Sequence, residues 1–177
     1  FLNIVEGVRT QDLKCKIISV GSSEEYGIVK NDDLPLAENH PILPANPYAV
    51  ARVSEEYLAQ IYSKGYHFNI CTTRSFNHIG PGQKDNFVIS SIAKQFADIS
   101  VNNRKPVISI GDGTIIRDFT DVRDVILAYD KIFEKGEPGE TYNVCSGKGY
   151  SIFEIVTLLS ELTGIPVTLE KQKDLLR

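Results

Sequence analysis

Apolar residues recur along the chain in two patterns. Short runs rich in β-branched residues at positions 16–20, 68–73, 107–110 and 142–144 are typical of strands, and the first two are typical of buried ones. In other segments apolar residues return every three or four positions, which predicts helices near residues 1–9, 47–64, 87–99, 121–133 and 151–163. Strands that alternate with helices predict an α/β architecture with a parallel sheet.

The longest predicted helix follows a polar, proline-rich loop. Asn46 is a typical capping residue, and Pro47 suits the first helical position because its missing N–H needs no partner there. Gly65 is expected to end this helix. Its spacing places four apolar side chains on one face, namely Val50, Val53, Tyr57 and Ile61.

Two later helices also carry start signals. Asp121 is expected to cap the helix that follows it. Ser151 and Glu154 have the spacing of a capping box, in which each side chain bonds to the backbone N–H of the other residue. Gly164 is expected to end the helix that this box opens.

Composition narrows the class of protein. The 177 residues are 42% hydrophobic and 24% charged with a net charge of −4, as in a globular cytoplasmic protein rather than a nucleic-acid binder. No apolar run approaches the roughly 20 residues that span a bilayer, so we expect no membrane partner. The three cysteines are widely spaced, and we expect buried free thiols at Cys15, Cys71 and Cys145. The chain contains no methionine and is expected to be part of something longer.

The first candidate site is the polar turn after the strand at residues 16–20. In an open α/β sheet, ligands bind beyond the carboxyl ends of the strands. Ser22, Ser23 and Glu24 lie at that position, where hydroxyls and a carboxylate can exchange protons with a sugar carbonyl. An ordinary polar turn has the same composition, so this segment does not decide the function alone.

A second candidate combines Tyr48 and Arg52, which lie one helical turn apart. A cation beside a phenol stabilises the phenolate, which is how a tyrosine becomes a usable acid or base. The same spacing is common on any surface helix.

Two further segments offer ligand-binding groups. The stretch from Ser75 and Phe76 through Asn77 to the glycines and proline at 80–82 follows a predicted strand, and the Asn77 amide can both donate and accept hydrogen bonds. Arg117 precedes a helix start and offers a planar fork for a diphosphate, as does the terminal Arg177. Solvated ion pairs would equally explain the alternating charges that follow Arg117.

Together these segments resemble the extended short-chain dehydrogenase/reductase family of NAD-dependent epimerases and dehydratases. The likeness rests on residues 22–27, 76–83, 122–124 and 142–147, and it covers essentially the whole chain. It is greatest to reductases that convert GDP-4-keto-6-deoxy-D-mannose to GDP-D-rhamnose. The resemblance implies NADP or NAD as cofactor, a GDP-sugar substrate and a homodimer of the full-length protein.

The resemblance also implies roles for individual residues. Tyr48 would protonate the C4 ketone oxygen while Ser22 orients it, and Arg52 would stand where the family has lysine. Ser23 and Glu24 would complete the catalytic turn. Tyr48, Arg52, Ser75 and Phe76 would contact the cofactor. The nucleotide sugar would be held by Asn77, Phe87, Val88, Arg117 and Arg177.

The sequence departs from the family pattern in two ways. It has no G-x-x-G-x-x-G turn, so we expect the first roughly 100 residues of the fold to be missing. Residues 1–80 and 118–146 would then be the rest of a dinucleotide-binding Rossmann domain, and 81–117 and 147–177 a nucleotide-sugar domain. The second departure is arginine in place of lysine at Arg52, which is not a conservative exchange. Two alternatives stay open: a GDP-mannose 4,6-dehydratase with Glu24 as base, and a non-catalytic nucleotide-sugar-binding protein.

Overall fold

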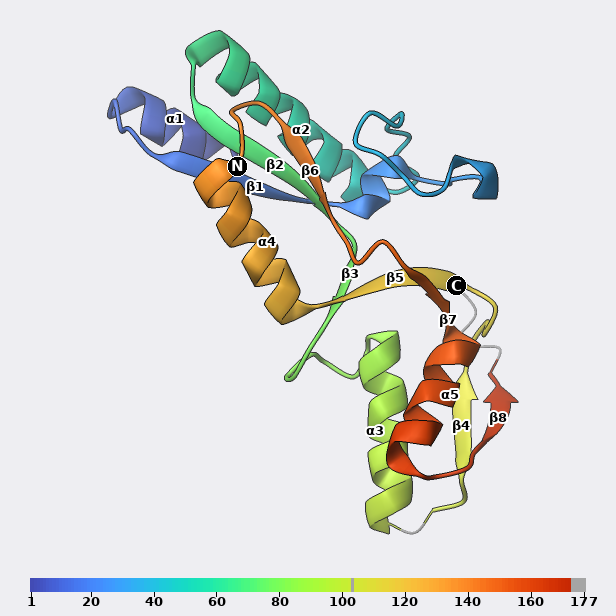
Figure 1. Cartoon of the computed structure of the whole chain (residues 1–177). Coiled ribbons are helices and arrows are strands. Elements are labelled where there is room, and N and C mark those ends of the chain that lie inside the picture. Colours follow the sequence, from blue (N-terminus) through green and yellow to red (C-terminus); the bar gives the residue numbers. More distant parts are fainter. Residues whose placement is uncertain (103, 173–177) are drawn as a thin grey trace. The chain divides into compact units, whose positions relative to one another are not determined.

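The fold consists of two compact units, seen in a computed structural model that describes residues 1–102 and 104–172 (Figure 1). The first unit comprises Phe1–His78 and Val122–Gly147, and the second Ile79–Asp121 and Lys148–Arg177. The cofactor and substrate roles that we expected for two parts of the chain stay predictions.

The first unit is built on a parallel sheet. Its strands are β1 (Lys16–Ser22), β2 (Asn69–Ser75) and β6 (Thr141–Val144), in the order β1-β2-β6. Ser22 pairs with Ser75, and Ser75 with Val144, so the carboxyl ends of all three strands lie at one level. The predicted α/β class with a parallel sheet is therefore confirmed.

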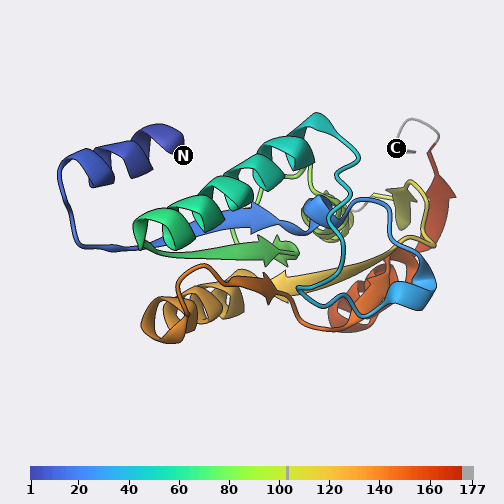
Figure 2. The same ribbon diagram turned by 90° about the horizontal axis from the view of Figure 1, so that it is seen from above.

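Helices cover both faces of this sheet (Figure 2). On one face, Ile70 of β2 packs with Val5 of α1 (Leu2–Thr10) and with Ala59 and Tyr62 of α2 (Pro47–Tyr66). On the other face, Cys71 packs against α4 (Val122–Lys135) through Val125 and Ile132. Ile70 and Cys71 are neighbours whose side chains point to opposite faces, as a strand requires.

The second unit packs helices α3 (Val88–Asn102) and α5 (Ile152–Thr163) with short strands. Its apolar core includes Ile92, Phe96, Ile108, Ile152 and Val156. The capping box at Ser151 and the end at Gly164, which has φ 69°, are confirmed. The strands are β4 (Val107–Ile110), parallel to β8 (Thr168–Lys171), and β5 (Ile116–Asp121), antiparallel to β7 (Gly149–Ser151). The short strand β3 (Asn77–Ile79) lies where the chain leaves the first unit.

Several sequence expectations about α2 and β1 need correction. Asn46 caps α2 as predicted, but the helix continues past Gly65 to Tyr66 and ends where His67 adopts a left-handed conformation with φ 58°. The strand β1 forms as predicted, yet Ser19 is its only buried residue. Within the described part of the chain β1 lies at the edge of its sheet, which leaves one side uncovered.

The exposure of the cysteines also differs from expectation. Only Cys71 is buried, whereas Cys15 and Cys145 are exposed, because both lie at strand ends rather than inside the sheet.

Asp121 directly precedes α4, but it is also the last residue of β5, a strand that the sequence pattern did not predict. The strands β3, β7 and β8 were missed as well, because each is short and contains a single large apolar or aromatic residue, which sets no period.

Candidate functional site

The turn after β1 is organised by a capping box. Ser22 precedes a short 3₁₀ helix, η1 (Ser23–Tyr26), and its hydroxyl oxygen accepts a hydrogen bond from the Glu24 backbone N–H at 3.2 Å. The Ser22 backbone N–H in turn donates to Oε1 of Glu25 at 2.7 Å. Because the hydroxyl oxygen of Ser22 acts as an acceptor here, its proton is left to donate to a ligand.

The start of α2 is bound directly to this turn. The Asn46 amide donates to Oε2 of Glu24 at 2.7 Å, while its oxygen caps α2 by accepting from the Ala49 backbone N–H at 2.8 Å. One side chain thus joins the candidate turn to the helix that carries Tyr48 and Arg52. The structure therefore brings together all five predicted catalytic residues, Ser23 at the start of η1 included, in one unit.

Tyr48 and Arg52 lie one turn apart with the guanidinium over the phenol ring, 5.1 Å from its centroid. Nη1 of Arg52 also donates to Glu55 at 2.8 Å and to the carbonyl oxygen of Val20 at 3.4 Å. Burial alone would lower the pKa of Arg52, but its interactions with Tyr48 and Glu55 raise that pKa above its usual value. The Tyr48 side chain is half exposed, so its phenol is accessible beside a permanent cation.

The residues at the end of β2 take different positions. The Ser75 side chain is buried, and its hydroxyl shares a hydrogen bond of 2.7 Å with the Tyr129 hydroxyl of α4. The Phe76 ring lies 6.4 Å from the Tyr26 ring, centroid to centroid. Asn77 is exposed at the start of β3. Of these three, only Phe76 and Asn77 present side chains that a ligand could reach.

The remaining predicted binding residues belong to the second unit. Phe87 and Val88 are exposed at the start of α3, and Arg117 is exposed on β5, where its Nη1 donates to the adjacent Ile116 carbonyl at 3.0 Å. Arg177 lies outside the described residues.

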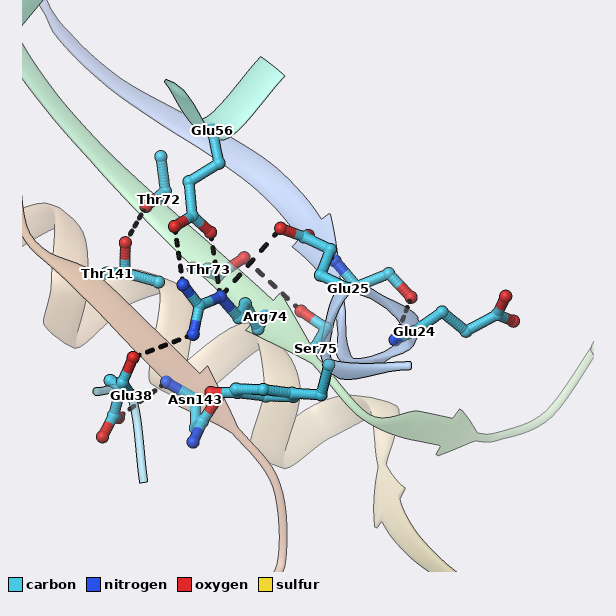
Figure 3. A network of polar contacts seen from close by, with 12 residues as sticks. Glu24, Glu25, Glu38, Glu56, Thr72, Thr73, Arg74, Ser75, Thr141 and Asn143 are labelled. Atoms are coloured by element: carbon cyan, nitrogen blue, oxygen red, sulfur yellow. Dashed lines mark hydrogen bonds and ion pairs between the residues drawn. The ribbon is translucent and has the colours of Figure 1, made fainter. Parts of the chain in front are cut away.

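Beneath the candidate turn is a buried ionic cluster that sequence reasoning missed (Figure 3). Arg74 of β2 binds both carboxylate oxygens of Glu56 of α2, through Nε at 2.9 Å and Nη2 at 2.6 Å. Its Nη1 donates to the Glu38 carbonyl at 2.9 Å, and its guanidinium carbon lies 4.8 Å from the centroid of the Tyr26 ring. Burial would lower the pKa of Arg74, but the hydrogen bonds to Glu56 raise it, so the arginine is a permanent cation.

The third member of this cluster is Glu25, which is fully buried. Its Oε2 lies 4.0 Å from Nε of Arg74 and, among the described residues, has no hydrogen-bond partner. Burial raises the pKa of Glu25 to about 7, and the nearby Glu56 adds to this, whereas the Ser22 N–H and Arg74 act in the opposite direction. Two buried carboxyls therefore lie beside one buried guanidinium.

Weak sequence signals for these residues did exist. Ser22 and Glu25 have capping-box spacing, and Arg74 interrupts a strand that is otherwise buried, where a charge needs a partner. Glu56 shares a helix face with the buried Ala49 and Ser63. The partner of Arg74, however, could not be chosen from spacing alone.

Residues 1–102 and 104–172 contain no group of three or more His, Cys, Asp or Glu side chains arranged to hold a metal ion. No helix there is both long and apolar enough to cross a membrane.

The sequence is similar to one family model and to several known proteins. The family model described as GDP-mannose 4,6 dehydratase matches residues 1–175. GDP-6-deoxy-D-mannose reductase of Pseudomonas aeruginosa is 36% identical over 164 residues, which are 93% of this chain and 54% of that protein. Human dTDP-D-glucose 4,6-dehydratase is 34% identical over 147 residues, 83% of this chain and 40% of that protein. The chain thus spans about half the length of the curated relatives it matches.

Solved structures agree with these relatives. The structure of RMD from Pseudomonas aeruginosa complexed with NADPH superposes with a TM-score of 0.92 at 34% identity, over 97% of this chain and 57% of that one. A dTDP-glucose 4,6-dehydratase from Bacillus anthracis in complex with NAD gives a TM-score of 0.82 at 25% identity, over 97% of this chain and 54% of that one.

Proposed function

Because the chain belongs to the GDP-mannose 4,6-dehydratase family of extended short-chain dehydrogenases/reductases, we propose that the full-length protein reduces the C4 ketone of GDP-4-keto-6-deoxy-D-mannose to GDP-D-rhamnose. The observation that carries this proposal is the bond between Asn46 and Glu24, which joins the turn of Ser22 to the helix of Tyr48 and Arg52. The 36% identity to a GDP-6-deoxy-D-mannose reductase supports the choice of substrate.

In this reaction Tyr48 gives its phenolic proton to the ketone oxygen, and the Ser22 hydroxyl donates a hydrogen bond to the same oxygen. Both groups stabilise the negative charge that develops on that oxygen as C4 is reduced. The cation of Arg52 over the Tyr48 ring stabilises the phenolate left behind. A bound NADPH or NADH supplies the hydride to C4.

The chain's residues fit the nicotinamide end of such a cofactor. Tyr48 is half exposed beside a fixed positive charge, and the Phe76 ring offers an apolar surface. The Ser75 hydroxyl is already bound to Tyr129, so we assign Ser75 a contact through its main chain. This sequence has no glycine-rich turn for a pyrophosphate, and we assign it only the nicotinamide end.

We assign the contacts with the GDP-sugar to five residues. Asn77 offers an amide, Arg117 and Arg177 offer guanidinium groups for the diphosphate, and Phe87 and Val88 offer exposed apolar surface for the base. The proposed domain roles stay as the sequence predicts them: the first unit is part of a dinucleotide-binding domain, and the second is a nucleotide-sugar domain.

Product analysis by mass spectrometry and NMR tests the reaction. The full-length protein with NADPH is expected to convert GDP-4-keto-6-deoxymannose to GDP-rhamnose and to leave GDP-mannose unchanged. Loss of water from GDP-mannose would favour the dehydratase alternative and make the exposed Glu24 its base. Binding of either nucleotide sugar without turnover would favour the non-catalytic alternative.

We also propose that the full-length protein is a homodimer that pairs through α2. Val50, Tyr57 and Ile61 form one stripe on this helix, and each is more than half exposed, at 51%, 51% and 57%. Exposed apolar stripes of this kind mark protein interfaces.

Sedimentation velocity of the full-length protein is expected to show a dimer, and Ile61→Glu is expected to shift the dimer toward monomer. Leu162→Glu, on the exposed face of α5, is the matched control. A wild-type monomer would refute this.

A further inference from the structure

Glu25 is buried, and its carboxyl binds the backbone N–H of Ser22, the residue that we propose orients the substrate. Its Oε1 accepts from the Ser22 N–H at 2.7 Å, and its main-chain carbonyl accepts from the Leu43 N–H at 3.1 Å. The residue thus fixes both the turn after β1 and the loop that precedes α2. Glu24, by contrast, is exposed.

The chain makes room for this carboxyl at Gly21. A Cβ at Gly21 would collide with Oε1 of Glu25 and would lie 2.5 Å from the carbonyl oxygen of Thr73. The absence of a side chain at Gly21 therefore lets the carboxyl reach the Ser22 N–H.

The charge balance around Glu25 favours a neutral acid. The titratable groups facing it are Glu56 from α2 and Arg74 from β2, with the Tyr26 ring of η1 against the guanidinium. The remaining Arg74 contact is the uncharged carbonyl of Glu38. Nε and Nη2 of Arg74 donate to Glu56 and its Nη1 donates to the Glu38 carbonyl, so an ionised Glu25 would be a buried charge that, among the described residues, has no hydrogen-bond donor on Oε2. Such a charge is costly, and protonation removes it.

We propose that Glu25 is the positioning residue of the candidate turn: as a neutral acid it holds the Ser22 amide in place, and its ionisation loosens the turn. The raised pKa of Glu25 supports this, because burial outweighs the opposing bond from Ser22. The inference depends on the proposed function only for the role of the Ser22 hydroxyl.

The sign of the expected pH dependence follows from linkage. The pKa of Glu25 is about 7 while the turn is closed, that is, while its carboxyl is buried against the Ser22 N–H, and returns to its ordinary value of 4.5 once the turn opens. The closed turn therefore holds more protons between these values, and the stability of the turn falls as the pH rises through this window. Above pH about 7 it levels off.

Hydrogen exchange of the Ser22 amide tests the proposal without any substrate. In the wild-type full-length protein its protection factor is expected to fall at least about tenfold between pH about 5 and about 8. Glu25→Gln, which keeps an acceptor and cannot ionise, is expected to show constant protection. Glu25→Met, which offers no oxygen, is expected to lose protection at every pH. Glu161→Gln, an exposed carboxyl of α5, is the control and should keep the wild-type profile.

Kinetics give a second readout that a purely structural role would not change. The wild-type kcat/KM is expected to decline as the pH rises through about 7, and Glu25→Gln should remove that decline. A pH-independent protection factor in the wild-type protein, or equal protection in Glu25→Gln and Glu25→Met, would overturn the proposal. Absence of reductase activity with the expected exchange profile would refute the proposed function alone.

Discussion

Replacing Arg74 with methionine is expected to destabilise the folded protein by about 3–5 kcal/mol, because it leaves the buried Glu56 carboxylate without its cation. Glu56 is only 4% exposed, so it cannot recover its lost interactions from water. Methionine keeps much of the side-chain volume, so the loss reports on charge rather than on a cavity. Urea denaturation of the full-length protein, followed by circular dichroism, measures the change.

Two further variants show whether the loss of stability comes from the buried cluster or would follow from removing any ion pair. Arg104→Met removes an exposed cation 3.7 Å from Asp98, and we expect a cost below about 1 kcal/mol. Adding Glu56→Leu to Arg74→Met should recover more than half of the loss, because an apolar pair can replace a buried ion pair at little cost. A loss below about 1 kcal/mol for Arg74→Met would contradict the cluster as described.

Replacing Arg52 with lysine is expected to raise the turnover number by up to about a hundredfold, because in the proposed reaction the planar guanidinium cannot meet a ribose hydroxyl as a compact ammonium would. Its guanidinium is held by Glu55 at 2.8 Å and by the Val20 carbonyl at 3.4 Å, and it lies over the Tyr48 ring. A compact ammonium keeps the positive charge and can turn toward the cofactor. Steady-state kinetics with NADPH and GDP-4-keto-6-deoxymannose measure kcat and both KM values.

The accompanying controls locate the effect in proton transfer. The KM for the GDP-sugar should stay nearly unchanged, because Arg52 does not contact the nucleotide in this proposal. Adding Tyr48→Phe to Arg52→Lys should remove most of the gain, since the phenol is the proton donor in the proposed reaction. If both the wild-type protein and Arg52→Lys show no turnover, the non-catalytic alternative becomes the better one.

The sequence alone predicted the caps, the helix ends and the order of the main elements, because these depend on local chemistry. The cap at Asn46, the capping box at Ser151 and the helix end at Gly164 are confirmed, because each depends on bonds within a few residues. The order of helices and main strands followed from periodicity, which also depends only on neighbours. The proximity of Tyr48 and Arg52 followed from helical spacing, and the structure places one over the other.

The tertiary structure decided what is buried and which charges meet. The exposed stripe of α2 and the uncovered edge of β1 were not foreseen, because periodicity marks an apolar face but not what covers it. The cluster of Glu25, Glu56 and Arg74 joins a turn, a helix and a strand that are distant along the chain. The protonation of a buried carboxyl depends on desolvation and on the charges around it, and only the assembled fold sets both.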